Sequence, residues 1–445
     1  MNLVYKVNDK PRFAQLIVFA LQQLLAILAA TIAVPSIVGN GMSQSAALFG
    51  AGVGTIVYLL FTKFKSPVFL GSSFAFLGSM FAAFGGAASV SVGYAGLIIG
   101  AVFAGLVYVI IAIVVKVAGV KWVSKLMPPV VIGPTVAIIG LSLAGNAIGN
   151  AFGFGSPQAS YTMNGAMWVN LICALVTLFT VIFFSVKGKK MMKLIPFILG
   201  IIAGYLVALV FTLIGKSSGN DSLKILDFSA FSAMKWVPEF TFVEAFKGFG
   251  AIDAKYIASI AVAYVPVAFV VFAEHIADHK NLSSIIGHDL LEDPGLHNTL
   301  LGDGIGSMVG AFFGGCPNTT YGESVGCVAI TGNASVVTIL ATSILAIAAS
   351  FCGPFVTFLS TIPTCVMGGV CITLYGFIAV SGLKMLQPVD LNDNPNLFTA
   401  SVILIAGIGG MTMNIGSVTL TEVACALILG VIVNLLFNRP AKKAQ

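Results

Sequence analysis

Charged residues are scarce in this 445-residue chain, and their scarcity excludes a soluble globular protein. Asp, Glu, Lys and Arg make up only 9% of the sequence, whereas soluble domains average about a quarter. Hydrophobic residues account for 58%, and the mean hydropathy is +1.03. Because each spanning helix needs about 20 apolar residues, we expect an all-α polytopic membrane protein with about 14 transmembrane segments.

Patterns typical of metal sites and disulfides are also lacking. The seven cysteines lie in apolar segments without a CxxC pair, so we expect small buried side chains and no disulfide. Among the four His, His275 and His279 have the spacing of half a zinc site, but no third ligand is evident nearby. We expect no metal and no cofactor, and an intramembrane metalloenzyme built on these two His remains an alternative from another class.

The net charge of +6 does not indicate a nucleic-acid partner, because the Lys and Arg residues are scattered over loops. Cytoplasmic loops of membrane proteins are rich in Lys and Arg. If both termini are cytoplasmic, every Lys and Arg outside the long outer loop 215–255 falls on the inner side, Lys63, Lys121, Lys125 and Lys190 among them. We therefore expect an even number of spans. The N-terminus lacks a cleavable signal pattern, so we expect the first helix to remain.

The predicted spans follow the apolar runs between these loops. They begin near Phe13, Ser43, Pro67, Val92, Met127, Ala166, Leu194, Tyr256, Leu300, Pro317, Val336, Pro363, Leu397 and Val418.

Two weak internal matches predict an inverted repeat. Residues 66–73 resemble 316–324, with Pro followed by Gly four or five residues later, and 128–133 resemble 363–368, with Pro, Val and Gly in register. Both matches join segments that are seven spans apart, so the two halves would have opposite topology in a 7+7 arrangement. In transporters built this way, paired Gly- and Pro-interrupted spans mark a site near the bilayer midplane.

The interrupted stretches 67–76 and 317–326 lie in predicted spans 3 and 10. Their β-branched and aromatic residues favour short extended strands rather than unbroken helix. Such backbone is tolerated within a membrane only where it lines a protein-walled cavity. The amides of Phe74 and Gly322 would then stand at half-helix N-termini, ready to donate to a ligand carbonyl or anionic group.

Few carboxylates lie within or beside the predicted spans: Glu274, Asp278, Asp303, Glu323 and Glu422. An ionisable residue inside a membrane is a candidate functional residue, and Glu323 directly follows the second interrupted stretch. Glu274 and Asp278 share a helical face, where like charges repel, so a proton held there would suit a coupling site. Alternatively, Asp278 reaches cytoplasmic water. We expect Asp303 to support the core helices and Glu422 to mark the outer edge of the last span.

Several motifs together resemble the nucleobase–ascorbate transporter family, and within it the bacterial uracil-permease branch. The family signature has Glu or Gln, then Asn, any residue, Gly, four residues and Thr, and Glu323 through Thr331 matches it except at Ser324. The resemblance covers nearly the whole chain and includes the motifs at 71–76, 272–275, 319–326, 331–332 and 374–376.

This resemblance implies a core domain and a gate domain with the ligand between them. The core would comprise residues 1–118 and 253–360, and the gate 119–252 and 361–445. It also implies a multi-pass protein of the bacterial cytoplasmic membrane, surrounded by the lipid bilayer, that imports a small nucleobase and is compatible with a homodimer.

Residue by residue, the resemblance assigns a substrate site and a proton-coupling site. Glu274 and Glu323 would hold the base, and the amides of Phe74 and Gly322 would bind its carbonyls. The side chains of Tyr321 and Tyr375 would wall the pocket. Protons would be the coupling ion, with Glu274, Asp278 and Asp303 as the candidate groups.

Three departures from the family pattern bear on the substrate and the proton route: Ser324 replaces Asn, Asp278 stands where uracil permeases tend to have His, and Gln23 replaces a His in the first span. Glu323, where purine members usually carry Gln, favours a pyrimidine. We expect proton-coupled uracil uptake and no enzymatic activity. A xanthine or urate permease of the same family, and an anion transporter of the same general fold, are the alternatives.

Overall fold

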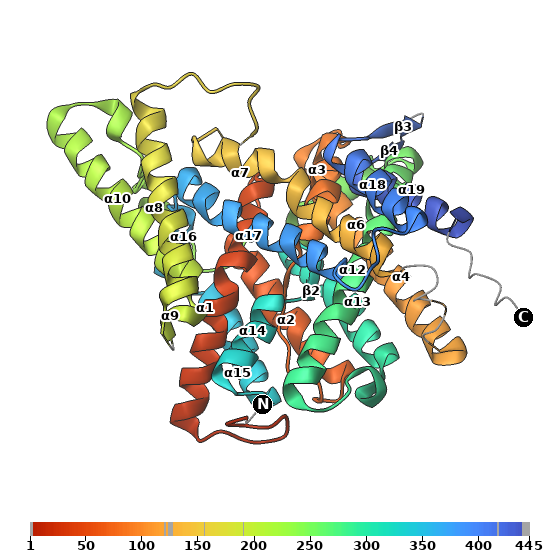
Figure 1. Ribbon diagram of the computed structural model, residues 1–445. Coiled ribbons are helices and arrows are strands. Elements are labelled where there is room, and N and C mark those ends of the chain that lie inside the picture. The colour runs from red at the N-terminus through yellow and green to blue at the C-terminus, as the bar shows by residue number, and fades with distance from the viewer. Residues whose placement is uncertain are drawn as a thin grey trace, which may run out of the picture.

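The computed structural model describes residues 3–119, 122, 128–154, 156–189, 191–415 and 418–437. The predicted span start near Met127, the basic residues Lys121, Lys125 and Lys190, and the C-terminal stretch from 438 onward lie outside these residues. Long apolar helices dominate the described part, and two short two-stranded sheets accompany them (Figure 1).

The first half of the chain contains the following elements: α1 (Phe13–Val38), α2 (Gln44–Phe61), β1 (Leu70–Ser72), the 3-10 turn η1 (Phe74–Phe76), α3 (Leu77–Gly85), α4 (Val90–Ala118), α6 (Pro129–Ser142), α7 (Ala144–Ala151), α8 (Gly165–Lys187), α9 (Met191–Leu194), α10 (Pro196–Ser218), η2 (Asp221–Leu223), η3 (Ser229–Ala233), α11 (Thr241–Gly248) and η4 (Phe249–Ala251).

The second half contains α12 (Ala254–Ile286), the π-turn η5 (Leu291–Gly295), α13 (Leu296–Gly314), β2 (Asn318–Thr320), α14 (Gly322–Thr331), α15 (Val336–Ser350), α16 (Gly353–Ser360), α17 (Thr364–Met385), α18 (Asn394–Ile408), β3 (Met413–Ile415), β4 (Val418–Leu420) and α19 (Glu422–Phe437).

Among the described residues, eight helices are long and apolar enough to cross a membrane: α1, α2, α4, the α6–α7 pair, α8, α10, α12 and α17. The pair α15 and α16 passes the same test together but bends by 80°, and three shorter apolar helices are 74–85, α18 and α19. The protein is therefore a multi-pass membrane protein, because the bilayer interior admits such apolar helices and little else.

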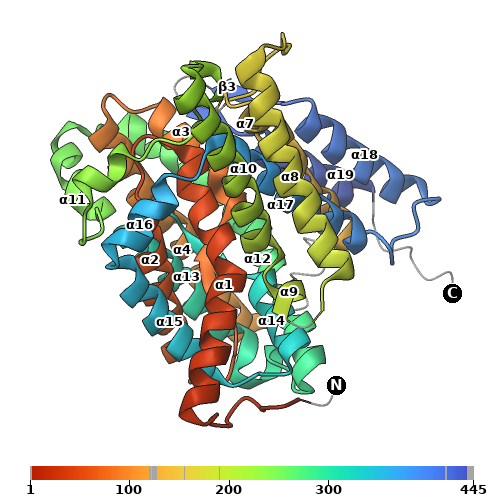
Figure 2. The same cartoon turned by 90° about the vertical axis from the view of Figure 1, so that its left-hand side faces the viewer.

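The helices form two groups, and most helix contacts join members of the same group. In one group, α13 packs between α2 and α4, and α15 packs on α1 and α2. In the other group, α17 packs on α6, α7 and α8, α10 packs on α8, and α18 packs on α6 and α19. Figures 1 and 2 show α8 and α10 along one side of the molecule, with α17 running between α8 and α6.

Glycine allows the backbones of α2 and α13 to approach closely. A Cβ atom on Gly50 would lie 2.5 Å from the carbonyl oxygen of Gly310, and one on Gly54 would lie 2.7 Å from that of Gly306. Small residues at helix interfaces permit this approach in membranes, where van der Waals packing replaces the hydrophobic driving force.

The structure corrects some sequence expectations. The last apolar helix begins at Glu422, four residues after the predicted start at Val418, because 418–420 form β4. Cys352 is exposed, while the other six cysteines are buried. Cys352 is exposed because it lies at the bend between α15 and α16 rather than inside a helix.

Candidate functional site

A cavity of about 370 Å³ lies at the point where the two interrupted stretches meet, and helices α6, α10 and α17 of the second group line it as well. This volume is within the usual range for small-ligand pockets. Its walls come from α12, the β1–η1 and β2–α14 junctions, α6, α10 and α17. The lining residues are Ser73, Phe74, Ala75, Val136, Ile139, Phe197, Glu274, Ala277, Asp278, Thr319, Thr320, Tyr321, Gly322, Glu323, Leu374, Phe377, Ile378, Ser381 and Met385.

Strands β1 and β2 bring the two halves of the chain together at this cavity. They pair antiparallel, with Leu70 opposite Thr320 and Ser72 opposite Asn318. A helix follows each strand, so Phe74 and Gly322 both stand at helical N-termini on the cavity wall. The first amides of a helix have no acceptor within it and carry partial positive charge, which suits a ligand oxygen.

Tyr321 is fixed across the strand pair. Its hydroxyl donates to the backbone carbonyl of Ser72 at 2.7 Å. Its ring covers Gly71, where a Cβ atom would lie 2.3 Å from the ring carbon Cζ. Gly71 is therefore required for this position of the ring, which forms part of the cavity wall.

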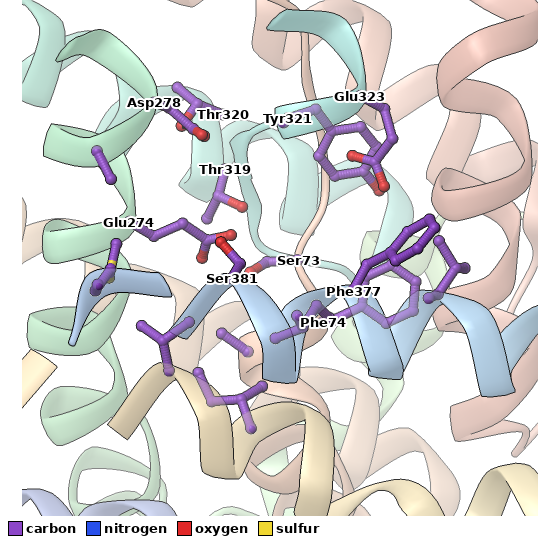
Figure 3. A pocket seen from close by; sticks show the side chains of 18 of the residues that line it. Ser73, Phe74, Glu274, Asp278, Thr319, Thr320, Tyr321, Glu323, Phe377 and Ser381 are labelled. Atoms are coloured by element: carbon purple, nitrogen blue, oxygen red, sulfur yellow. The ribbon is translucent and has the colours of Figure 1, made fainter. Parts of the chain in front are cut away.

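Two partly buried glutamates face the cavity from different helices. Glu274 lies on α12, and Figure 3 shows its carboxylate directed toward Ser381 and Ser73. Glu323 lies in the first turn of α14, where the helix dipole favours a negative charge. The cavity therefore offers two separate carboxylates to one ligand.

Asp278 lies one turn after Glu274 on the same face of α12. Its Oδ2 atom accepts a hydrogen bond from Thr320 Oγ1 at 2.8 Å, so α12 is joined to the end of β2. The structure thus places Asp278 within α12 and on the cavity wall.

Asp303 lies outside the lining of this cavity and is bound to a histidine. Its Oδ2 atom is 2.6 Å from Nδ1 of His275, and both side chains are buried. Nε2 of His275 is 3.0 Å from Thr299 Oγ1. These bonds join α12 to α13, which agrees with the expected supporting role.

The two histidines of the H-x3-H pair have protein partners of their own. His279 lies 2.6 Å from the hydroxyl of Tyr58 through Nε2 and 2.8 Å from the carbonyl oxygen of His275 through Nδ1. In the part of the chain that the structure describes, no group of three His, Cys, Asp or Glu residues could hold a metal ion.

Tyr375 stands behind the wall rather than in it. Its ring packs edge to face on Phe74, with 5.9 Å between centroids and an angle of 78°. It therefore supports Phe74, which lines the cavity, while Tyr375 itself does not.

Sequence reasoning missed the contribution of α17. Leu374, Phe377, Ser381 and Met385 lie three or four residues apart and face the cavity together. That spacing is a visible signal for one helical face. However, the helix is apolar on nearly every side, so the face toward the ligand does not stand out.

Gln23 and Ser324, two of the residues that differ from the family pattern, are in contact with each other. Gln23 Nε2 donates a hydrogen bond to Ser324 Oγ, which also accepts from the amide of Phe69 at 2.9 Å. Ser324 thereby ties α14 to α1 and to the residue before β1. The substitutions at these two positions form one local arrangement.

Comparison with known proteins identifies the family of this chain. The sequence profile of the Permease family matches residues 14–416. The chain belongs to this family. It is thus a transporter and not an enzyme, and the sequence-based assignment to a permease family is confirmed.

Relatives of this permease align over nearly their full length. The uracil permease of Bacillus caldolyticus is 41% identical over 98% of this chain and 95% of its own. The uracil permease of Bacillus subtilis is 38% identical over 99% and 96%, and that of Escherichia coli K12 is 33% identical over 97% and 93%.

Solved structures share the fold of this permease at low sequence identity. The transmembrane domain of the cyanobacterial bicarbonate transporter BicA has a TM-score of 0.66 at 16% identity, covering 96% of this chain and 98% of that domain. Murine Slc26a9, an anion transporter in the inward-facing state, has a TM-score of 0.66 at 14% identity and covers 96% and 69%. These likenesses concern the fold alone.

Proposed function

We propose that this permease imports uracil across the bacterial cytoplasmic membrane by alternating access, with protons as the coupling ion. The observation that carries the proposal is a 370 Å³ cavity in which two carboxylates and two helix N-termini face one another. The names of the aligned relatives support uracil as the substrate.

The chemistry of this cavity suits the edge of a uracil ring, which presents N–H donors beside carbonyl acceptors. A carboxylate of Glu323 or Glu274 can accept from a ring N–H, and the amides of Phe74 and Gly322 can donate to ring carbonyls. A site built from such paired groups rejects an analogue that lacks them, because its own buried polar groups would lose their partners.

Glu274 and Asp278 are the proposed coupling groups. They lie four residues apart on α12, both at the cavity, and two close carboxylates resist simultaneous ionisation. A proton taken up by this pair would relieve the repulsion and leave a neutral carboxyl able to donate to the substrate. Base binding and protonation would then favour each other.

The proposed membrane architecture has about 14 spans in a 7+7 inverted repeat. The spans would be α1, α2, α3, α4, α6 with α7, α8 and α10, followed by α12, α13, α14, α15, α17, α18 and α19. The antiparallel strands β1 and β2 precede the third and tenth of these and support a two-fold relation between the halves.

Within this architecture, residues 1–118 and 253–360 would form the core and residues 119–252 and 361–445 the gate. The separate packing of α2, α4, α13 and α15, and of α6, α8, α17 and α18, supports this division. Both termini would be cytoplasmic, with lipid around the helices, and a homodimer stays an expectation from the family resemblance.

Uptake of radiolabelled uracil into proteoliposomes tests the proposal. We expect uptake to be stimulated by an inwardly directed proton gradient and abolished by a protonophore. Uptake that ignores the gradient would overturn the coupling. A purine permease remains the second candidate, and uptake of radiolabelled xanthine by the same proteoliposomes, without uptake of radiolabelled uracil, would favour it.

A further inference from the structure

A second, much smaller void lies behind the substrate cavity, among α4, α12, α13 and β2. Its volume is about 10 Å³, and its polar lining consists of Tyr108, Asp303, Ser307, Asn318 and Thr319. Nothing in the proposed transport mechanism uses this void. Its dimensions match a single small molecule, since a buried water needs roughly 10–15 Å³ of such space.

Two of the residues that line this void each carry a buried polar atom with no hydrogen-bond partner among the described residues. These atoms are Oδ1 of Asp303 and the hydroxyl oxygen of Tyr108. Asp303 is 1% exposed, and Tyr108 is 4% exposed. The other carboxylate oxygen of Asp303 is bound to His275, so Oδ1 cannot turn away without breaking that bond. A buried polar group without a partner is destabilising, and native proteins rarely leave one unpaired.

We propose that this void is a binding site for one water molecule, which bridges Tyr108 and Asp303. The phenol hydroxyl can donate to the water oxygen, and the water can donate to Oδ1 of the carboxylate. Ser307 supplies a further hydroxyl on the same wall. A water with two to four such partners satisfies both unpaired atoms at little entropic cost.

The bound water connects α4 and α13 at this place. It links Tyr108 of α4 to Asp303 of α13, and through His275 it extends to α12, the helix that carries Glu274. Thr319 of β2 lines both this void and the substrate cavity. The water therefore supports the strand from behind and acts as a positioning element for the site.

X-ray radiolytic labelling with mass spectrometry tests the site directly, because hydroxyl radicals formed from a bound water modify the side chain beside it. Purified detergent-solubilised protein in H₂¹⁸O is used, and the readout does not depend on transport of any nucleobase. We expect Tyr108 to incorporate ¹⁸O several-fold faster than Tyr58, which is also buried but whose hydroxyl bonds to Ser66 and His279. Equal labelling of the two tyrosines would overturn the proposal.

Two variants sharpen this test. Ser307→Val places a branched apolar side chain in the void, so labelling of Tyr108 should fall to the level of Tyr58. The matched control is Ser343→Val at a buried serine of α15 away from the void, which should leave that labelling unchanged. If Ser307→Val does not fold, Tyr108→Phe serves instead, because the ring stays reactive while the water loses a partner. Undiminished labelling in a folded variant contradicts the assignment.

Discussion

Glu323 occupies a position where charge and geometry reinforce each other. It lies in the first turn of α14, directly after Gly322, so a carboxylate and a free backbone amide are adjacent on the cavity wall. An acceptor and a donor side by side match the alternating N–H and C=O groups of a pyrimidine ring edge. An amide side chain at this position would instead offer both functions by itself.

Glu323→Gln should therefore change what the cavity recognises. We expect uracil binding to weaken by about 1.5–3 kcal/mol, the usual worth of a hydrogen bond to a charged group. Isothermal titration with uracil and with xanthine measures the change, and binding of xanthine should rise relative to uracil. Unaltered uracil affinity in this variant would show that Glu323 does not contact the base.

Thr320→Val should affect the coupling group rather than the base itself. The Thr320 hydroxyl donates to Asp278, and valine keeps the shape while removing that donor. A hydrogen bond to a charged carboxylate stabilises its ionised form, so Asp278 without this donor keeps its proton to higher pH. We therefore expect the pH profile of proton-stimulated uptake to move to higher pH by up to about one unit.

The control for this variant is Thr342→Val on α15, a buried threonine whose hydroxyl donates to backbone carbonyls away from the cavity. It should leave the pH profile unchanged. If both variants behave alike, the Thr320–Asp278 bond has no role in coupling.

Single residues also mark the limit of sequence reasoning. Glu274, Glu323 and the amide positions stood out because charge and broken helix are rare in an apolar chain. Gln23 and Ser324 each depart from the family pattern, but the contact between them could not be predicted because the two residues are about 300 positions apart. Tyr375 was placed by family resemblance, which cannot distinguish a side chain that lines a cavity from one that supports its wall.

At the scale of elements, the closest helix contact depends on glycines, which have no side chain to keep the two backbones apart. Helices α2 and α13 touch through glycines, with backbone oxygens where a Cβ atom would otherwise stand. In the strand pair, Gly71 likewise has no Cβ atom where the ring of Tyr321 lies against the backbone.

Gly50→Ala should separate α2 from α13. The new Cβ atom would lie 2.5 Å from the Gly310 oxygen, and because that oxygen belongs to the backbone the helices must move apart. We expect a loss of about 1–3 kcal/mol, which overpacking typically costs, read as a lower thermal unfolding midpoint of the purified protein.

Gly376→Ala on α17 is the matched control, because a Cβ atom there meets nothing within 4 Å. Alanine has the higher helix propensity, so this variant should be neutral or slightly stabilised. Equal destabilisation by both substitutions would refute the close-packing argument for α2.

The sequence predicted which elements would be irregular better than it predicted which helical faces matter. Extended residues around 70 and 319 were visible because β-branched and aromatic side chains interrupt helical composition there. The ligand-facing side of α17 could not be predicted from the sequence, because residues of a membrane helix are apolar both where they contact lipid and where they contact protein.

For the whole molecule, the proposed mechanism requires the core to move against the gate. Gly78 of α3 and Ser142 of α6 belong to opposite sides and line the same void of about 10 Å³, and a Cβ atom on Gly78 would meet nothing within 4 Å. A covalent link between them would prevent the movement.

Gly78→Cys combined with Ser142→Cys, in a background without the seven native cysteines, should lose uracil uptake after treatment with a short bis-methanethiosulfonate cross-linker that spans the void, and regain it after reduction. Each single substitution, treated in the same way, is the control and should transport throughout. A cross-linked double variant that still transports would rule out relative movement at this contact.

The pairing of β1 with β2 also has a consequence for biosynthesis. Residues 70 and 320 are partners, so about 250 residues must be made between the first strand and its complement. At roughly 5–20 residues per second, the ribosome needs on the order of 10–50 seconds for that interval. Throughout it, the nascent protein carries an unpaired strand edge next to an apolar bilayer, which cannot satisfy its amides and carbonyls. The substrate pocket therefore cannot form until β2 has been synthesised. Before that, the nascent chain most needs protection of its unpaired strand edge.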